Sequence, residues 1–290
     1  MANSNVALLW QKSSDLGSYS QGAWSGSLPL DNMKNADLRR VARSTNALVA
    51  STRWRVDLGA SVPRPVSAFA LLGHNGTTAA TWRVVVTSDA DDSDASLRVL
   101  DTGVMNLWQP TVVSGQLPWG VFPWNGIDPT AYPGGSLAFH ISQTTAFGRY
   151  IWVYVSDPDN PASYFDAGRF LGGVAWQPRI NMNYGASIRW VDNSEARRTL
   201  GGRRLVTSRP KFRQFEMAFD YLSKSEALGT AFEIGRTLGK GGDFLVITDP
   251  TEGGEFAYRR AIYAALSETS SIENSGLYTW RWGLSAEELI

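Results

Sequence analysis

The stretch that decides the fold reads Tyr150-Ile151-Trp152-Val153-Tyr154-Val155. It is apolar at odd and even positions alike, so other parts of the chain must cover both faces of a strand formed here. Directly after it, residues 157–161 read Asp-Pro-Asp-Asn-Pro, in which two prolines cannot donate to a sheet and Asp and Asn favour turns. The pattern predicts a central strand of a layered β domain, followed by a domain boundary.

Other β-rich runs precede this strand, separated by clusters of Gly, Pro, Asn and Asp. These runs cover residues 54–58, 67–72, 82–88 and 137–141. Short strands at such spacing are typical of a sandwich of antiparallel sheets. We therefore predict that residues 1–156 form one β-sandwich domain, with a short helix at the start of residues 31–50.

The chain after the boundary is built differently, because all ten Glu residues lie at Glu195 or later. Apolar residues at odd positions from Phe215 to Tyr221 alternate with mostly polar ones, which predicts a strand with one buried face. Ser223 and Glu226 then match a capping box, so we predict a helix over 223–238. Strands are predicted at 243–248, 259–266 and 278–284. Residues 157–290 are thus expected to form a second β-rich domain with one packed helix.

The overall composition excludes several classes of protein. Lys and Arg number 27, Asp and Glu also 27, and Cys 0, so no net field attracts nucleic acid and no disulfide or thiolate site exists. No apolar run approaches the roughly 18 residues of a membrane span, and the start of the chain lacks signal-peptide features. We expect neither nucleic-acid binding nor membrane insertion. Arg supplies 22 of the 27 basic residues, a bias that indicates protein interfaces.

Motifs for catalysis, metals and nucleotides are weak or missing. His74 and His140 are the only histidines, and each is better explained by a structural role than by a catalytic one. The acidic run 89–94 begins like a calcium loop but has Asp94 at the glycine position, so a solvated hairpin tip explains it better. The Gly-Lys-Gly-Gly run at 239–242 lacks the spacing of a phosphate-binding loop. We expect no enzyme activity, no cofactor and no metal.

Aromatic residues provide the remaining binding signal. Trp108, Trp119, Trp124 and Tyr132 lie in the Gly- and Pro-rich stretch 107–135, and His74 lies in another loop. Exposed aromatic rings on loops can stack on sugars or anchor a protein partner, and they can equally close one end of the core. All three interpretations stay open at this point.

With these residues in view, the chain resembles tail-tip or baseplate structural proteins of long-tailed bacteriophages, similar in organisation to distal tail proteins. Residues 54–59, 69–75 and 81–86 resemble the discoidin-like, galactose-binding-like jelly rolls that such virion proteins contain. Residues 168–170, Pro178, 184–185 and the run from Phe215 to Pro250 resemble the ring-forming domain that extends a tail tube. The order of the two domains is the reverse of that usual in distal tail proteins.

The resemblance implies a structural virion protein at the tail tip, made in the bacterial cytoplasm. Identical subunits would form a ring, with a hexamer favoured over a trimer, that joins the tail tube to the baseplate hub and the host-attachment apparatus. Closing a ring would satisfy the free edges of its sheets. The expected subunit contact is a set of arginines, namely Arg197, Arg198, Arg203, Arg204, Arg209 and Arg213.

Two other functions remain as alternatives to this structural role. A lectin-like first domain would recognise host surface saccharide through Trp108, Trp119, Trp124, Tyr132 and His74. A polysaccharide hydrolase would need only two carboxylates, and no pair among the 27 acidic residues stands out.

Overall fold

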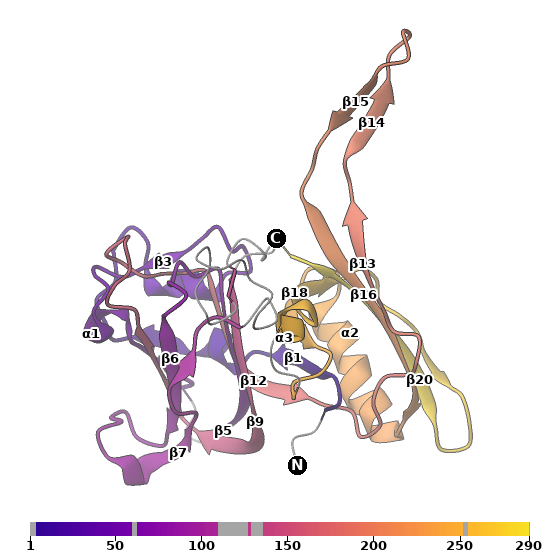
Figure 1. The fold of residues 1–290 in the computed structure, drawn as a ribbon. Coiled ribbons are helices and arrows are strands. Elements are labelled where there is room, and N and C mark those ends of the chain that lie inside the picture. Colours follow the sequence, from indigo (N-terminus) through magenta and orange to yellow (C-terminus); the bar gives the residue numbers. More distant parts are fainter. Residues whose placement is uncertain (1–3, 60–62, 110–126, 129–135, 252–254, 290) are drawn as a thin grey trace. The chain divides into compact units, whose positions relative to one another are not determined.

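The computed structural model describes residues 4–59, 63–109, 127–128, 136–251 and 255–289, shown as the coloured ribbon in Figure 1. The chain divides into two compact units, of which the first contains Met1–Gln177 and Leu245–Ala261 and the second Pro178–Phe244 and Ile262–Ile290. The prolines at 157–161, where the sequence predicts the boundary, lie inside the first unit. Both units are built mainly of antiparallel strands, so the predicted mainly β fold is confirmed.

The first unit contains two antiparallel sheets. The first sheet has the order β2 (Ser18–Ser20), β4 (Trp54–Asp57), β10 (Tyr150–Ser156), β6 (Thr81–Thr87) and β7 (Arg98–Asp101), with β8 (Met105–Asn106) also on β6. The second sheet has the order β17 (Asp243–Ile247), β1 (Ala7–Gln11), β12 (Arg169–Trp176), β5 (Arg64–Leu72) and β9 (Leu137–Gly148). The strands predicted at 54–58, 67–72, 82–88 and 137–141 are all present.

Short elements connect these strands. β3 (Ala42–Arg43) pairs with β11 (Asp166–Ala167). Single turns of 3-10 helix lie at Ser13–Leu16, Leu30–Lys34 and Ala95–Leu97, and the α-helices are α1 (Val49–Thr52) and α3 (Glu255–Arg259). The helix expected at the start of residues 31–50 corresponds to the 3-10 turn at Leu30–Lys34.

The core of the first unit lies between its two sheets, which makes the unit a sandwich. Ile151, Val153 and Val155 point into this core from β10, where they meet Phe69 from β5 and Phe170 from β12. All five side chains are fully buried, so each stabilises the fold by roughly 1.5–3 kcal/mol. The central position predicted for the strand at 150–155 is confirmed, since β10 lies between β4 and β6.

The opposite face of β10 is covered as well, which explains why its even positions are also aromatic. Trp152 packs parallel to Tyr154 at a ring distance of 6.1 Å. The guanidinium of Arg55 lies 5.5 Å from the centre of the Trp152 ring, and its Nη1 donates to the carbonyl of Ala90 at 2.9 Å. Tyr154 also bonds to the carboxylate of Asp92. The acidic run 89–94 therefore closes over this face of the sheet.

The second unit contains neighbouring strands of a sheet and one helical segment. These strands have the order β13 (Ser187–Asp192), β16 (Lys211–Leu222), β20 (Trp280–Glu288) and β18 (Ala261–Leu266), with β19 (Ile272–Asn274) also on β20. The predicted period-2 pattern is confirmed from Phe215 to Phe219, which are both 1% exposed, whereas Glu216 between them is exposed. It is wrong for Tyr221, which is 57% exposed, because the register of β16 with β20 shifts after Phe219. Phe219 also stacks on Trp282 of β20 at 5.5 Å.

The helical segment begins at the predicted capping box. The backbone N–H of Ser223 donates to Glu226 Oε2 at 3.0 Å, and the N–H of Glu226 donates to Ser223 Oγ at 3.3 Å. Such a box stabilises a helix start by about 1 kcal/mol. One stretch of π-helix, Glu226–Ala231, leads into α2 (Phe232–Leu238). The helix predicted at 223–238 is confirmed, with this π-helical first half as a local difference.

Candidate functional site

A long hairpin, which we call the arm, leaves the sheet of the second unit and comprises residues 187–211. It contains β13, then β14 (Glu195–Arg198) paired with β15 (Arg204–Thr207), and it returns at the start of β16. Figure 1 shows this ribbon continuing beyond helix α2 and ending at β14 and β15. Every residue of β14 and β15 is exposed. An isolated two-stranded ribbon is marginally stable in water, so this geometry indicates a partner surface.

The tip of the arm is a defined turn. The N–H of Thr199 donates to the carbonyl of Arg203 at 2.9 Å, and the N–H of Gly202 donates to the carbonyl of Thr199 at 2.9 Å. Gly202 has φ of +83°, a conformation that favours glycine. The Gly201-Gly202 pair therefore lets the two strands meet in a tight hairpin.

The arm is strongly basic. Its residues include seven Arg or Lys and two Asp or Glu, which leaves five net positive charges. Both acids are neutralised within the arm, because Glu195 pairs with Arg209 at 2.5 Å and Asp192 pairs with Lys211 at 3.3 Å. Hydrogen bonds from the side chain and the backbone N–H of Ser194 hold the pKa of Asp192 below its usual range.

Three of the arm's arginines are left for an outside partner. Arg198, Arg203 and Arg204 are exposed, and no ion pair joins them to a carboxylate in the described part of the chain. Because the whole chain is neutral, everything outside the arm carries five net negative charges. The arm and the rest of the molecule are thus electrostatically complementary.

Apolar side chains on the arm are exposed too. Ile188 and Trp190 are 51% and 55% exposed. In the strand register they stand opposite Phe215 and Arg213, so they lie on the face of the sheet that becomes buried farther along β16. Leu200 at the tip is fully exposed. Among the described residues, twelve of the nineteen exposed large apolar side chains belong to the second unit, which holds about a third of the chain. Such concentration marks an interaction surface.

One predicted contact residue, Arg213, lies at the root of the arm and is buried. Its Nε and its backbone N–H both donate to Glu288 Oε2 at 3.0 Å. The side chains are 6% and 3% exposed, so this pair ties the base of the arm to β20. Arg197 and Arg209 pair with Glu195 in the same arm. A contact of these arginines with a second subunit stays a prediction.

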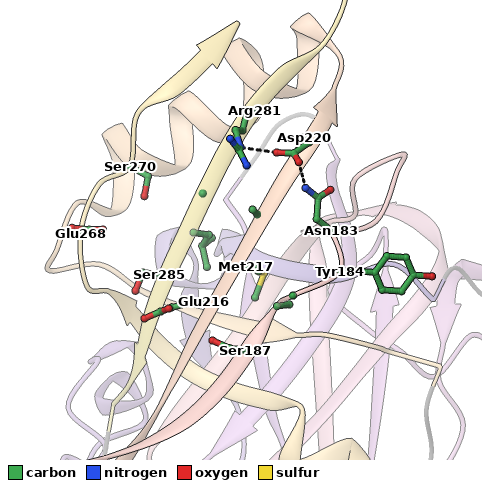
Figure 2. A pocket seen from close by; sticks show the side chains of 15 residues that line it. Asn183, Tyr184, Ser187, Glu216, Met217, Asp220, Glu268, Ser270, Arg281 and Ser285 are labelled. Atoms are coloured by element: carbon green, nitrogen blue, oxygen red, sulfur yellow. Dashed lines mark hydrogen bonds and ion pairs between the residues drawn. The ribbon is translucent and has the colours of Figure 1, made fainter. Parts of the chain in front are cut away.

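An open groove of about 590 Å³ lies on the solvent face of the same sheet. Its floor is formed by small residues, since Ala218 of β16 stands opposite Gly283 of β20. Figure 2 shows Arg281, Asp220 and Asn183 linked at one end. There Arg281 Nε lies 2.7 Å from Asp220 Oδ1, and Asn183 donates to the other oxygen of the carboxylate.

The remaining groove wall is polar and acidic. Glu216 and Glu268 add two carboxylates, and Ser187, Ser270 and Ser285 add hydroxyl groups. Glu216 pairs with Arg189 of the arm at 3.0 Å. Tyr184 at the rim is fully exposed. Asp220 is held by Arg281 and Glu216 by Arg189, so Glu268 is the groove carboxylate without an ion pair among the described residues, and the groove is suited to a cationic or hydrogen-bonding ligand.

The two described residues of the predicted aromatic site lie in the core of the first unit. Trp108 is 6% exposed and donates from Nε1 to the carbonyl of Gly76 at 2.8 Å. The His74 ring stands edge-on to Trp108 at 5.0 Å and parallel to Phe165 at 6.3 Å. Burial lowers the pKa of His74 to about 3. Trp119, Trp124 and Tyr132 lie outside the described residues, so their contact with a ligand stays a prediction.

The described residues Trp108 and Ser136, on either side of the stretch that carries these three aromatics, both bond to the loop after β5. Before the stretch, Trp108 bonds to Gly76. After it, Ser136 Oγ accepts the N–H of His74 and donates to its carbonyl, both at 2.6 Å.

Sequence reasoning named the arm's arginines but missed the hairpin and the groove. The alternation from Ser187 to Asp192 and the Gly201-Gly202 pair are the available signals for the hairpin. The groove combines side chains from β13, β16, β20 and two loops, and its floor depends on the register of Ala218 with Gly283. No sequence pattern states that register.

In the described part of the chain, no cluster of three or more His, Cys, Asp or Glu could hold a metal ion. Within the same residues, no helix has both the length and the apolar character needed to cross a bilayer.

No protein-family model matches the chain, and no curated protein matches it either.

Several solved structures resemble the chain weakly. A CBM32 domain from a family 31 glycoside hydrolase of Clostridium perfringens has 10% identity and a TM-score of 0.36, covering 57% of this chain and 99% of its own. The family 32 carbohydrate-binding module of C. perfringens NanJ, solved with galactose, has 11% identity and a TM-score of 0.35, with 58% and 98% covered. A fucolectin from striped bass (Morone saxatilis) serum has 9% identity and a TM-score of 0.35, with 96% and 98% covered. Similarity this weak assigns no function to the chain.

Proposed function

We propose that this protein is a non-catalytic structural protein that assembles with copies of itself through the arm of the second unit. The observation that carries the proposal is the arm itself: residues 187–211 form an exposed ribbon with five net positive charges on an otherwise negative chain. A surface of this kind is costly to leave in water and is stabilised when a complementary surface covers it.

The arm supports attachment better than catalysis for two reasons. It exposes Trp190 and Leu200, and aromatic and large apolar residues with arginine are the side chains that dominate protein interfaces. The exposed apolar surface of the arm would contribute roughly 25 cal/mol to the free energy of association for each Å² that a partner removes from water. The ribbon also has about twelve residues a side, so at about 3.3 Å per residue it reaches roughly 40 Å.

This role agrees with the resemblance to tail-tip proteins predicted from the sequence. Under that proposal the copies form a ring, and the tail tube and baseplate hub are the neighbouring proteins. Heterologous contacts between identical subunits close into rings when the rotation between neighbours allows it. The virion location, the ring and its neighbours rest on the sequence resemblance, and the arm supports the assembly step alone.

Shortening the arm tests assembly. In the variant, residues 193–210 are replaced by Asn-Gly, so that Asp192 and Lys211, which face each other in the hairpin, are joined by a two-residue turn. We expect light scattering to show a concentration-dependent oligomer for the full chain and a monomer for the variant, with equal thermal stability of the remaining fold. A full chain that stays monomeric at millimolar concentration would contradict the proposal, as would a variant that still assembles.

Saccharide binding by the first unit is a second candidate function. The specific observation in its favour is that Trp108 and Ser136, which precede and follow the stretch with Trp119, Trp124 and Tyr132 in the sequence, both bond to the loop that contains His74. Binding residues are commonly held on loops that a rigid scaffold positions, and aromatic rings stack on sugars.

A glycan array tests this second function. We expect the full chain to bind a subset of bacterial surface saccharides and the Trp119→Ala, Trp124→Ala double variant to lose that binding while keeping its melting temperature. Trp190→Ala is the matched control, because it removes a half-exposed tryptophan from the arm instead. Absence of binding across a broad panel would rule the function out.

A further inference from the structure

The arm and the groove of the second unit have opposite charge. The arm carries five net positive charges, whereas the second unit outside the arm has six basic and nine acidic residues. Two arms placed side by side would repel each other. Contact between the arm of one copy and the body of another is therefore favoured over contact between two arms.

The groove is the part of that body best suited to the tip. Its wall includes the exposed carboxylates Glu216 and Glu268, and its floor of Ala218 and Gly283 leaves room for an inserted turn. Tyr184 stands exposed at its rim. The tip offers the matching chemistry, namely Leu200 with three arginines that lack a carboxylate partner among the described residues.

The length of the arm also determines whether the tip can bind the groove of its own chain or only that of another copy. The groove includes Ser187 at the base of the arm, whereas the tip turn begins at Thr199. Twelve residues of extended strand separate them, which is roughly 40 Å. The tip of a stiff two-stranded ribbon therefore cannot fold back into the groove of its own chain.

We propose that the tip of the arm, residues 198–204, inserts into the groove of a second copy of this chain. Leu200 packs against Tyr184 of the neighbour, and Arg198, Arg203 and Arg204 pair with its Glu268 and with its Glu216, which they share with the neighbour's own Arg189. The contact joins two different surfaces, so each copy both donates an arm and receives one, and the chain of contacts closes into a ring or continues as a filament. This inference rests on the proposed assembly role and adds the receiving surface.

A charge-swap experiment on the full chain tests the pairing. The arm variant carries Arg198→Glu, Arg203→Glu and Arg204→Glu, and the groove variant carries Glu216→Lys and Glu268→Lys. We expect each to weaken self-association by about tenfold or more, since attraction becomes repulsion at several exposed pairs. A chain with both sets should associate again to within about threefold of the wild type. Lys224→Glu with Lys240→Glu is the matched control, because both lysines are exposed in the second unit but outside the arm and the groove.

The outcomes separate the inference from the assembly role on which it rests. Reversing the charges of the arm could abolish association while reversing those of the groove does not, or the chain with both sets could fail to regain association. Either result would mean that the arm still assembles the protein but that the groove does not receive it. A wild-type chain that never associates contradicts both.

Related measurements test whether nucleic acid binds the arm or saccharide binds the groove. Association that disappears after nuclease treatment and returns with added duplex DNA would assign the arm to nucleic acid and overturn the inference. A groove variant that keeps its association but loses a glycan-array signal would assign the groove to saccharide, with the same consequence. Association should also weaken between 50 mM and 500 mM NaCl, since the pairs lie at the surface.

Discussion

Protonation of His74 should make the first unit strongly sensitive to acid. The ring is 6% exposed, and in the described part of the chain neither ring nitrogen has a hydrogen-bond partner. Burial lowers the pKa of His74 from 6.5 to about 3, because the charged form would lose its hydration and gain nothing in return. The folded chain thus keeps a neutral imidazole where an unfolded chain would bind a proton.

The sign of the effect follows from proton linkage. Above about pH 6.5 neither state binds the proton, so the group does not affect stability there. Below that value the unfolded chain takes up a proton that the folded chain refuses, and stability falls by about 1.4 kcal/mol per pH unit until the pH nears the folded pKa. Between pH 7 and pH 4.5 this amounts to roughly 3 kcal/mol.

The test compares the wild type with His74→Phe, which fills the site with an apolar ring that cannot titrate. Urea unfolding followed by tryptophan fluorescence at pH 7.5, 6.5, 5.5 and 4.5 gives the free energy of unfolding for both. All other groups are shared, so the difference between the two curves isolates His74. We expect the wild type to lose roughly 3 kcal/mol more than the variant on acidification.

Two further variants guard the interpretation. His74→Gln also cannot titrate in this range, so its stability should show the same pH dependence as that of His74→Phe. It serves as a second variant in case the phenylalanine packs poorly. His140→Gln is the matched control, since partial burial lowers the pKa of His140 as well but the residue is less enclosed. Parallel curves for the wild type and both His74 variants would refute the reasoning and show that His74 finds a partner for its charge.

Three further predictions concern stability. Glu288→Gln should lower the free energy of unfolding by about 3–5 kcal/mol in urea titrations, because it leaves Arg213 charged and buried at the root of the arm; a loss below 1 kcal/mol would mean that water reaches the arginine. Trp54→Ala should cost about 3–5 kcal/mol, since the ring is fully buried and packs edge-on to Phe170 at 5.5 Å, and an unchanged melting temperature would contradict this. Gly173→Ala should destabilise the first unit by about 3 kcal/mol or prevent folding, because the new Cβ would lie 1.8 Å from the carbonyl oxygen of Gln11; normal calorimetric melting would show that the two strands can separate there.

Much of the local structure follows from patterns that act over a few residues. The doubly apolar run at 150–155 required cover on both faces, and β10 has the core on one side and the acidic run 89–94 on the other. The alternation around Phe215 and the box of Ser223 with Glu226 specified a half-buried strand and a helix start. Periodicity and capping are local properties, so they survive without knowledge of the fold.

The sequence does not predict which distant segments pair as neighbouring strands. Arg169–Trp176 lies after the proline-rich run that predicted a boundary, yet it pairs with β1 and β5 in the first unit, as does Leu245–Ile247 with β1. Turn residues end a strand, but they do not say which sheet the next strand joins. Partner choice depends on burial summed over the whole unit.

The amino-acid sequence alone determined that the protein is mainly β, that its central strand is buried on both sides, and that arginines gather between residues 197 and 213. Only the tertiary structure decided that five of those arginines stand on a free ribbon while Arg213 is buried against Glu288, and that Ala218 and Gly283 meet to floor a groove. The physical reason is that exposure and juxtaposition are set by strand register and by what packs nearby, which residue type and spacing do not encode.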